Sequence, residues 1–242
     1  IVYCGFFYGI YFLCLMPREI MQMLKINSMK QVVLFVLIIF WVVLFSTMAG
    51  AAKAPDKGTY QEWAVIDGFR SAKFGYKEDD VLSAIKKDFK INKKDVSRVI
   101  NQQEKTVTLG IDAKDLLAGS GPSKVFYILG YKSKRLIHVN VTWGMPIQKK
   151  FNPQAVVSTA NQLRNYFAQK KYQKNGFALN AQLGEGVILV FQGKDRKGRA
   201  ARLLLSNPKN KGGEIGENIT LTLAYIEKPE DPDVFKIKDG DF

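Results

Sequence analysis

The sequence predicts an α+β protein in which two helix-plus-antiparallel-meander modules in tandem follow an N-terminal export segment. Three observations predict this architecture. Two segments carry apolar residues at helical spacing, each is followed by several β runs, and a long apolar run precedes both. Of the 242 residues, 47% are apolar and 24% are charged, which is typical of a folded globular chain. That length fits one or two domains.

The first element is the export segment, residues 29–52. Met29 and Lys30 precede fourteen apolar residues, Val32 to Phe45, and the small residues Ala49–Ala52 follow. A basic start, a short apolar stretch and an A-x-A-like end are typical of a secretory signal, with cleavage expected after Ala51 or Ala52. The alternative is a single-span inner-membrane anchor over 32–52, since about 20 residues span a bilayer. Both alternatives predict a periplasmic or exported location for residues 53–242.

Residues 1–28 come before that segment and begin with Ile rather than Met. We interpret them as a mis-assigned start, with Met29 as the true first residue, or else as an extra apolar leader. Both cysteines, Cys4 and Cys14, lie in this stretch. The exported part is therefore expected to have no disulfide, no thiol nucleophile and no cysteine metal site.

The first module is predicted over residues 63–147. Its helix spans Glu78–Phe89, because Val81, Leu82, Ile85 and Phe89 have helical spacing and the first turn is acidic. Asp95–Ile100 is expected to form a second short helix. Alternating residues then predict three strands, with Gly130–Arg135 as the hairpin turn between the last two. The strands are 106–111, 125–129 and 136–143.

The last of these strands has two distinct faces. Leu136, His138, Asn140 and Thr142 are expected on one face, and Ile137, Val139, Val141 and Trp143 on the other.

The second module is predicted over residues 151–228. Asn152 and Pro153 are typical of a helix start, and the helix is expected to end near 170–172. Strands follow at about 187–191, 199–205 and 219–226, with a turn at Gly193–Gly198. Residues 229–242 form a C-terminal tail that begins acidic and extended, and Val234–Phe242 are expected to add an edge strand. The two modules form either two small domains or one fused sheet.

One stretch of the first module runs from Gly68-Phe69 through Phe74-Gly75-Tyr76 to Val81 and Ile85, ahead of the predicted strands. This stretch resembles the small exported modules of the SmpA/OmlA (BamE) type and the β-lactamase-inhibitor proteins, which contain two such modules. Lys77 replaces the usual capping Ser or Thr, and the Gly-x-Pro after the helix and the lipoprotein Cys are absent. The resemblance implies a non-enzymatic module that binds another envelope protein, and it implies no catalytic residues.

The residues indicate no catalytic or metal-binding constellation. His138 is the single histidine and lies within a strand, and no H-E-x-x-H or phosphate-loop motif is present. The sequence therefore predicts a protein that is not an enzyme and has no cofactor or metal. A carboxylate-dependent envelope hydrolase remains an alternative, because the acidic cluster Asp67, Glu78, Asp79 and Asp80 lies around the first helix.

The net charge of +14 and its placement at two turns predict the partner. An exported chain is not expected to meet nucleic acid, so we expect an envelope protein as partner. The alternative is an anionic lipid head group or polysaccharide that is bound through the basic turns. Trp63 and Tyr131 are expected to be exposed beside them. The candidate binding residues are Trp63, Tyr131, Lys132, Lys134, Arg135, Lys194, Arg196 and Lys197.

Overall fold

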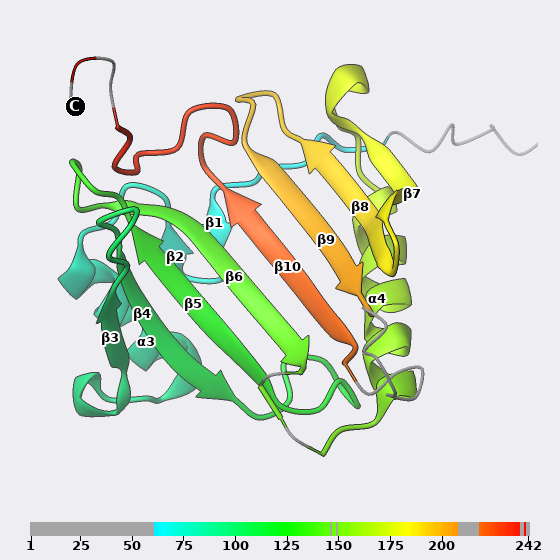
Figure 1. Cartoon of the computed structure of the whole chain (residues 1–242), viewed down its shortest axis with the longest axis horizontal. Helices are drawn as coiled ribbons and strands as arrows, with labels where there is room; N and C mark the ends of the chain where they lie inside the picture. The colour runs from blue at the N-terminus through cyan, green and yellow to red at the C-terminus, as the bar shows by residue number, and fades with distance from the viewer. Residues whose placement is uncertain (1–60, 146, 149, 208–217, 238–239, 241–242) are drawn as a thin grey trace, which may run out of the picture. The chain divides into compact units, whose positions relative to one another are not determined.

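The computed structural model describes residues 61–145, 147–148, 150–207, 218–237 and 240. The predictions for residues 1–28 and for the export segment 29–52 lie outside these residues. Within the described part of the chain, no helix is both long and apolar enough to cross a membrane. These residues form an α+β fold with one large antiparallel sheet, and two α-helices lie against one face of it (Figure 1).

The elements occur in two similar runs. A short ribbon of β1 (Gly68–Phe69) and β2 (Ala72–Lys73) precedes the first. The first run consists of α3 (Glu78–Phe89), β3 (Ser97–Ile100), β4 (Val107–Ala113), β5 (Ser123–Leu129) and β6 (Leu136–Gly144). The second run consists of α4 (Pro153–Ala168), β7 (Ala178–Gly184), β8 (Val187–Lys194), β9 (Ala200–Ser206) and β10 (Thr220–Ile226).

All eight long strands lie in one sheet, in the order β3-β4-β5-β6-β10-β9-β8-β7. The two four-stranded runs meet where β10 pairs antiparallel with β6, with Leu223 opposite Val141 and Tyr225 opposite Val139. Because β6 and β10 are the last strands of their runs, the second run lies beside the first in reverse strand order. Of the two arrangements expected from the sequence, the strands adopt the single sheet.

Helix α3 has the predicted boundaries, which confirms that prediction. The Asp80 carboxylate accepts a hydrogen bond from the backbone N–H of Lys77 at 3.1 Å and so caps the first turn. Lys90 ends the helix in a left-handed conformation with φ of 61°. The helix buries Val81 and Ile85 against the sheet, because these residues fall on one helical face.

Helix α4 also begins where the sequence predicts. The Asn152 side chain accepts a hydrogen bond from the backbone N–H of Gln154 at 2.9 Å, and Pro153 occupies the first turn. The apolar stripe of this helix packs onto the second half of the sheet. There Phe167 stacks on Phe191 with 5.1 Å between ring centroids.

Two predictions of secondary structure are wrong. Asp95–Ile100 is not a helix, because Lys93–Asp95 form a 3₁₀ turn and Ser97–Ile100 form the exposed edge strand β3. Val234–Phe242 contain no strand among their described residues, because the backbone of this segment bonds to loops instead of to a sheet edge. The sequence analysis also did not predict β7, the opposite edge strand, whose residues show no clean apolar alternation.

The predicted faces of β6 hold except at its start. Val139, Val141 and Trp143 belong to the buried core, and alternation places His138 on the opposite face. The prediction for Leu136 is wrong, because its side chain is fully buried in the core and not on the face of His138. The pairing skips Ile137 between the Ile128–His138 and Leu129–Leu136 pairs, and this bulge turns Leu136 to the core side.

Candidate functional site

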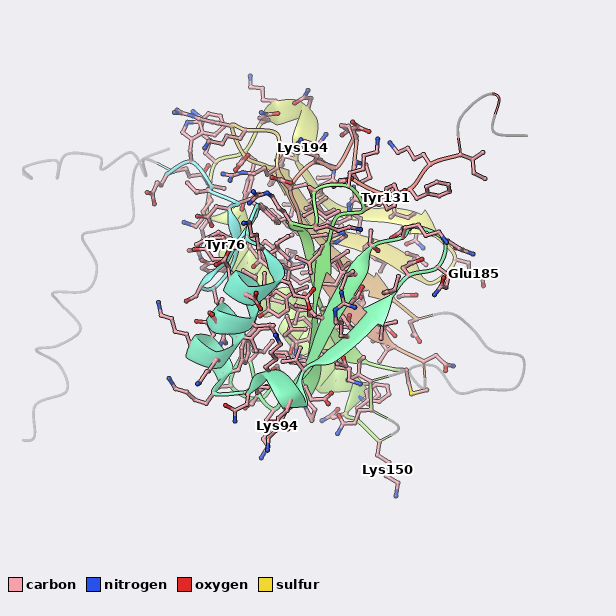
Figure 2. All side chains as sticks on the ribbon, turned by 90° about the vertical axis from the view of Figure 1, so that its left-hand side faces the viewer. Tyr76, Lys94, Tyr131, Lys150, Glu185 and Lys194 are labelled. Carbon is pink, nitrogen blue, oxygen red and sulfur yellow. The ribbon has the colours of Figure 1, made fainter. Side chains whose placement is uncertain are left out.

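The face of the sheet opposite the two helices is not covered by any helix of the described residues. In the side view, α3 and Tyr76 lie on one side of the sheet (Figure 2). One row of cross-strand neighbours crosses the middle of the opposite face from β5 to β8. Each residue of the row lies directly opposite the next: Phe126, Asn140, Ala224, Arg202 and Gln192. We call these five residues the central row.

The central row is nearly neutral. Arg202 carries its only charge, and the Arg202 Nε donates to Gln192 Oε1 at 2.9 Å. Phe126, Asn140 and Gln192 are half-buried, and Ala224 is buried. A solvated sheet face usually carries many Lys and Glu side chains, whereas the core of a protein interface is depleted of charge. The composition of the central row is therefore that of an interface.

His138 lies on the same face as the central row, one row nearer to the C-terminal ends of β5 and β10. Its Nε2 is 2.8 Å from Asn140 Oδ1. Burial lowers the pKa of His138, and the nearby Arg202 charge acts in the same direction, while the hydrogen bond to Asn140 opposes them. This environment therefore favours the neutral imidazole.

The two basic turns lie along the same edge of the sheet, the edge formed by the strand ends and not by β3 or β7. The Gly130–Arg135 turn joins β5 to β6, and the turn around Arg196 joins β8 to β9. The pairing runs across this edge from Ile128 through His138, Ile226 and Ala200 to Lys194. Since β10 alone separates β6 from β9, the nearest strands of the two turns are roughly two strand spacings, or about 10 Å, apart.

The predicted residues of the first turn are brought together there. Lys132, Lys134 and Arg135 are exposed. Arg135 Nη1 donates to the Gly75 carbonyl at 2.9 Å, and Lys134 Nζ lies 5.2 Å from the Tyr131 ring centroid. Tyr131 is half-buried, not exposed as predicted, because its ring packs edge-on against Phe235 at 5.6 Å.

Of the predicted residues of the second turn, Arg196 contacts Trp63. The Arg196 guanidinium lies 4.5 Å from the Trp63 ring centroid, and Lys171 Nζ lies 4.9 Å from it. Trp63 is consequently half-buried, which corrects the predicted exposure. Lys197 donates its backbone N–H to Asp195, and Lys194 forms an ion pair with Glu230.

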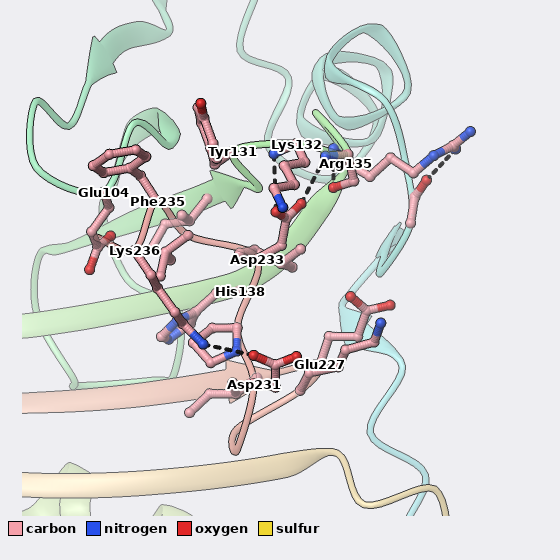
Figure 3. Close-up of a pocket in the computed structure, with 18 residues that line it drawn as sticks. Glu104, Tyr131, Lys132, Arg135, His138, Glu227, Asp231, Asp233, Phe235 and Lys236 are labelled. Carbon is pink, nitrogen blue, oxygen red and sulfur yellow. Dashed lines mark hydrogen bonds and ion pairs between the residues drawn. The ribbon is translucent and has the colours of Figure 1, made fainter. Parts of the chain in front are cut away.

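Part of the predicted C-terminal tail crosses this edge, a contact that was not predicted from the sequence. Residues 227–237, which we call the strap, run between the two turns and wall a pocket of about 1030 Å³ (Figure 3). The sheet side of this pocket is lined by Ile128, Ile137, His138 and Ile226. The repeated acids of the strap, Glu230, Asp231 and Asp233, were the available signal, since acidic residues are complementary to basic turns.

The predicted acidic cluster does not form a facing pair. Glu78 pairs with Arg98 at 2.9 Å, Asp79 with Lys93 at 3.5 Å, and Asp67 with Lys73 at 3.0 Å. Asp80 caps the helix. Among the described residues there is also no group of three or more side chains suited to hold a metal ion.

No family model, no curated protein and no solved structure matches this chain. The resemblance to the SmpA/OmlA (BamE) modules therefore stays a prediction.

Proposed function

We propose that this chain is an exported, non-enzymatic binding protein that docks another envelope protein on the helix-free face of its sheet. The observation that carries the proposal is the central row, because it is nearly neutral and mostly half-buried although no helix of the described residues covers it. Burial of such a row against a partner leaves few charges to desolvate. Arg and Phe are both enriched at protein interfaces, and Arg is one of the residue types that dominate their binding energies.

The repetition of one helix and four strands supports an interpretation as tandem modules. In that interpretation each module contributes half of the face, and the modules fuse along β6 and β10. The face is then wider than one four-stranded module can offer.

The proposal is tested with a photo-crosslinking amino acid at Thr142, which neighbours the central row, in the full chain within intact cells. We expect one discrete crosslinked protein at this position. The matched control is the same amino acid at Gln162, which is exposed on α4. Equal crosslinking from Gln162, or none from Thr142, would contradict docking on this face.

A second candidate function is the binding of an anionic lipid head group or polysaccharide. The observation that favours it is the placement of both basic turns at one sheet edge. Changing Lys132, Lys134, Lys194 and Arg196 together to Ala should then abolish flotation with anionic phospholipid vesicles, and salt should weaken flotation of the parent chain. Binding that neither salt nor these changes affect would exclude this candidate.

A further inference from the structure

The strap contacts the rest of the protein as a bound peptide would. It contains no helix or strand. Its backbone bonds to three separate segments: Glu227 N–H donates to the Ile137 carbonyl at 2.9 Å, and Phe235 N–H donates to the Glu104 carbonyl at 2.8 Å. Between them, the Asp233 carbonyl accepts from Tyr131 N–H at 2.8 Å. These main-chain contacts suit an extended segment of varied sequence.

Asp233 supplies the contact that depends on its side chain. Its carboxylate accepts the backbone N–H groups of Lys132 at 3.0 Å and Ser133 at 2.8 Å, as Figure 3 shows. Burial alone would raise the pKa of Asp233, but the hydrogen bonds from Ser133 and Lys132 hold that pKa below its usual range. The backbone N–H groups of Lys132 and Ser133 thus form a binding site for an ionised carboxylate, which we call the cradle.

Gly130 makes room for that carboxylate. A Cβ at this position would collide with the Asp233 carboxylate. Gly130 does not have a positive φ, so the backbone conformation itself does not require glycine here. The absence of a side chain at Gly130 instead fits the close approach of the acid.

The rest of the edge is complementary to an acidic extended segment. Glu230 of the strap pairs with Lys194, which places a second carboxylate on the second basic turn. Between the two acids, the strap crosses the apolar floor made by Ile128 and Ile226. The Glu230 side chain is 80% exposed, and exposed ion pairs contribute little to stability, so this contact is readily exchanged.

We infer that this edge is a binding site for an acidic, extended peptide segment of a partner protein, and that the strap fills the site in cis. The site consists of the cradle at Lys132 and Ser133, the apolar floor and Lys194. It is separate from the central row and does not depend on a protein docking there. A partner segment binds by displacing the strap.

The test uses a fluorescent peptide with the sequence of residues 227–237, EKPEDPDVFKI, and measures its anisotropy with the full chain. The strap competes at an effective concentration of roughly millimolar, so the parent chain should bind the peptide weakly. The double variant Asp233→Asn, Glu230→Gln weakens the strap but keeps the cradle. We expect it to bind the peptide at least about tenfold more tightly.

Two controls separate the cradle from net charge. The variant Glu227→Gln, Asp231→Asn removes the same charge, but Asp231 pairs with Lys236 inside the strap at 2.7 Å, so the cradle stays filled and affinity should not rise. Gly130→Ala added to the first double variant should abolish peptide binding. Two results would overturn the inference. One is equal affinity of the two double variants for the peptide. The other is equal affinity of the first double variant for the peptide and for a second peptide that has Asn at the position of Asp233.

Discussion

Asp195 and Arg199 form an ion pair in which the carboxylate is buried and the guanidinium is partly buried. Arg199 Nη2 lies 2.8 Å from Asp195 Oδ2, and the two side chains are 15% and 2% exposed. The Asp195 carboxylate also accepts the backbone N–H of Ile66 at 3.1 Å and that of Lys197 at 2.8 Å. One carboxylate therefore shapes the β8–β9 turn and ties it to the segment that leads into β1.

Changing Asp195 to Ala should lower the free energy of unfolding by about 3 kcal/mol, because it leaves the partly buried Arg199 charge and the backbone N–H groups of Ile66 and Lys197 without their partner. Urea denaturation of the full chain measures this loss. The matched control is Asp231→Ala, whose ion pair is exposed and should change stability by less than about 1 kcal/mol. Losses of similar size in the two variants would show that Asp195 does not have this role.

Tyr127→Phe should leave stability unchanged or raise it by up to about 1–2 kcal/mol. The Tyr127 side chain is fully buried, and its hydroxyl has no hydrogen-bond partner among the residues that the structure describes. Removing the oxygen ends a desolvation cost and keeps the ring in the core. Urea midpoints of parent and variant measure the difference, and Tyr131→Phe is the control, since Tyr131 is only half-buried. A clear loss of stability in Tyr127→Phe alone would reveal a partner for its hydroxyl.

Helix starts and central strands could be predicted from sequence, because burial of one face imposes a period on the apolar residues. Glu78–Phe89 and the start at Asn152 show this for helices, and the alternation from Val139 to Trp143 shows it for a strand. The edge strands β3 and β7 could not be predicted this way. Their side chains are mostly exposed, so no apolar period marks them.

The candidate site was predictable only in part for a similar reason. The turn positions of Lys132 and Arg196 follow from local glycine and charge patterns. Their shared edge depends on β6 pairing with β10, a contact between residues more than 70 positions apart that leaves no local signal. The same holds for Asp233, which reaches Ser133 across 100 residues.

Acid should release the strap from the first turn. The pKa of Asp233 is held below its usual range, so its contribution is fully present above about pH 4 and is lost as the pH falls through the lower, folded-state value. The amide NMR signals of Lys132 and Ser133 should therefore shift with one titration below about pH 4. In Asp233→Asn this titration should vanish, whereas Asp231→Asn should retain it. Amide signals that titrate alike in both variants would assign the effect to another group.

His138 should titrate below the ordinary histidine pKa of about 6.5, because burial disfavours its charged form. It is the only histidine in the chain, so its imidazole NMR signal needs no assignment. Its stabilising contribution is present above about pH 6.5 and is lost as the pH falls through the lower, folded-state value. The urea midpoint of the parent chain should therefore decrease as the pH is lowered from 7.5 to 5.5.

The matched variant His138→Gln should show less of this dependence, because glutamine does not titrate in that range. Arg202→Gln should raise the pKa of His138, since it removes a nearby positive charge on the same face. The comparison is decisive because Arg202 lies in the central row and His138 lines the pocket behind the strap. An unshifted pKa in Arg202→Gln would mean that the two parts of this face are electrostatically independent, whereas a raised pKa would show that the Arg202 charge influences the protonation of His138.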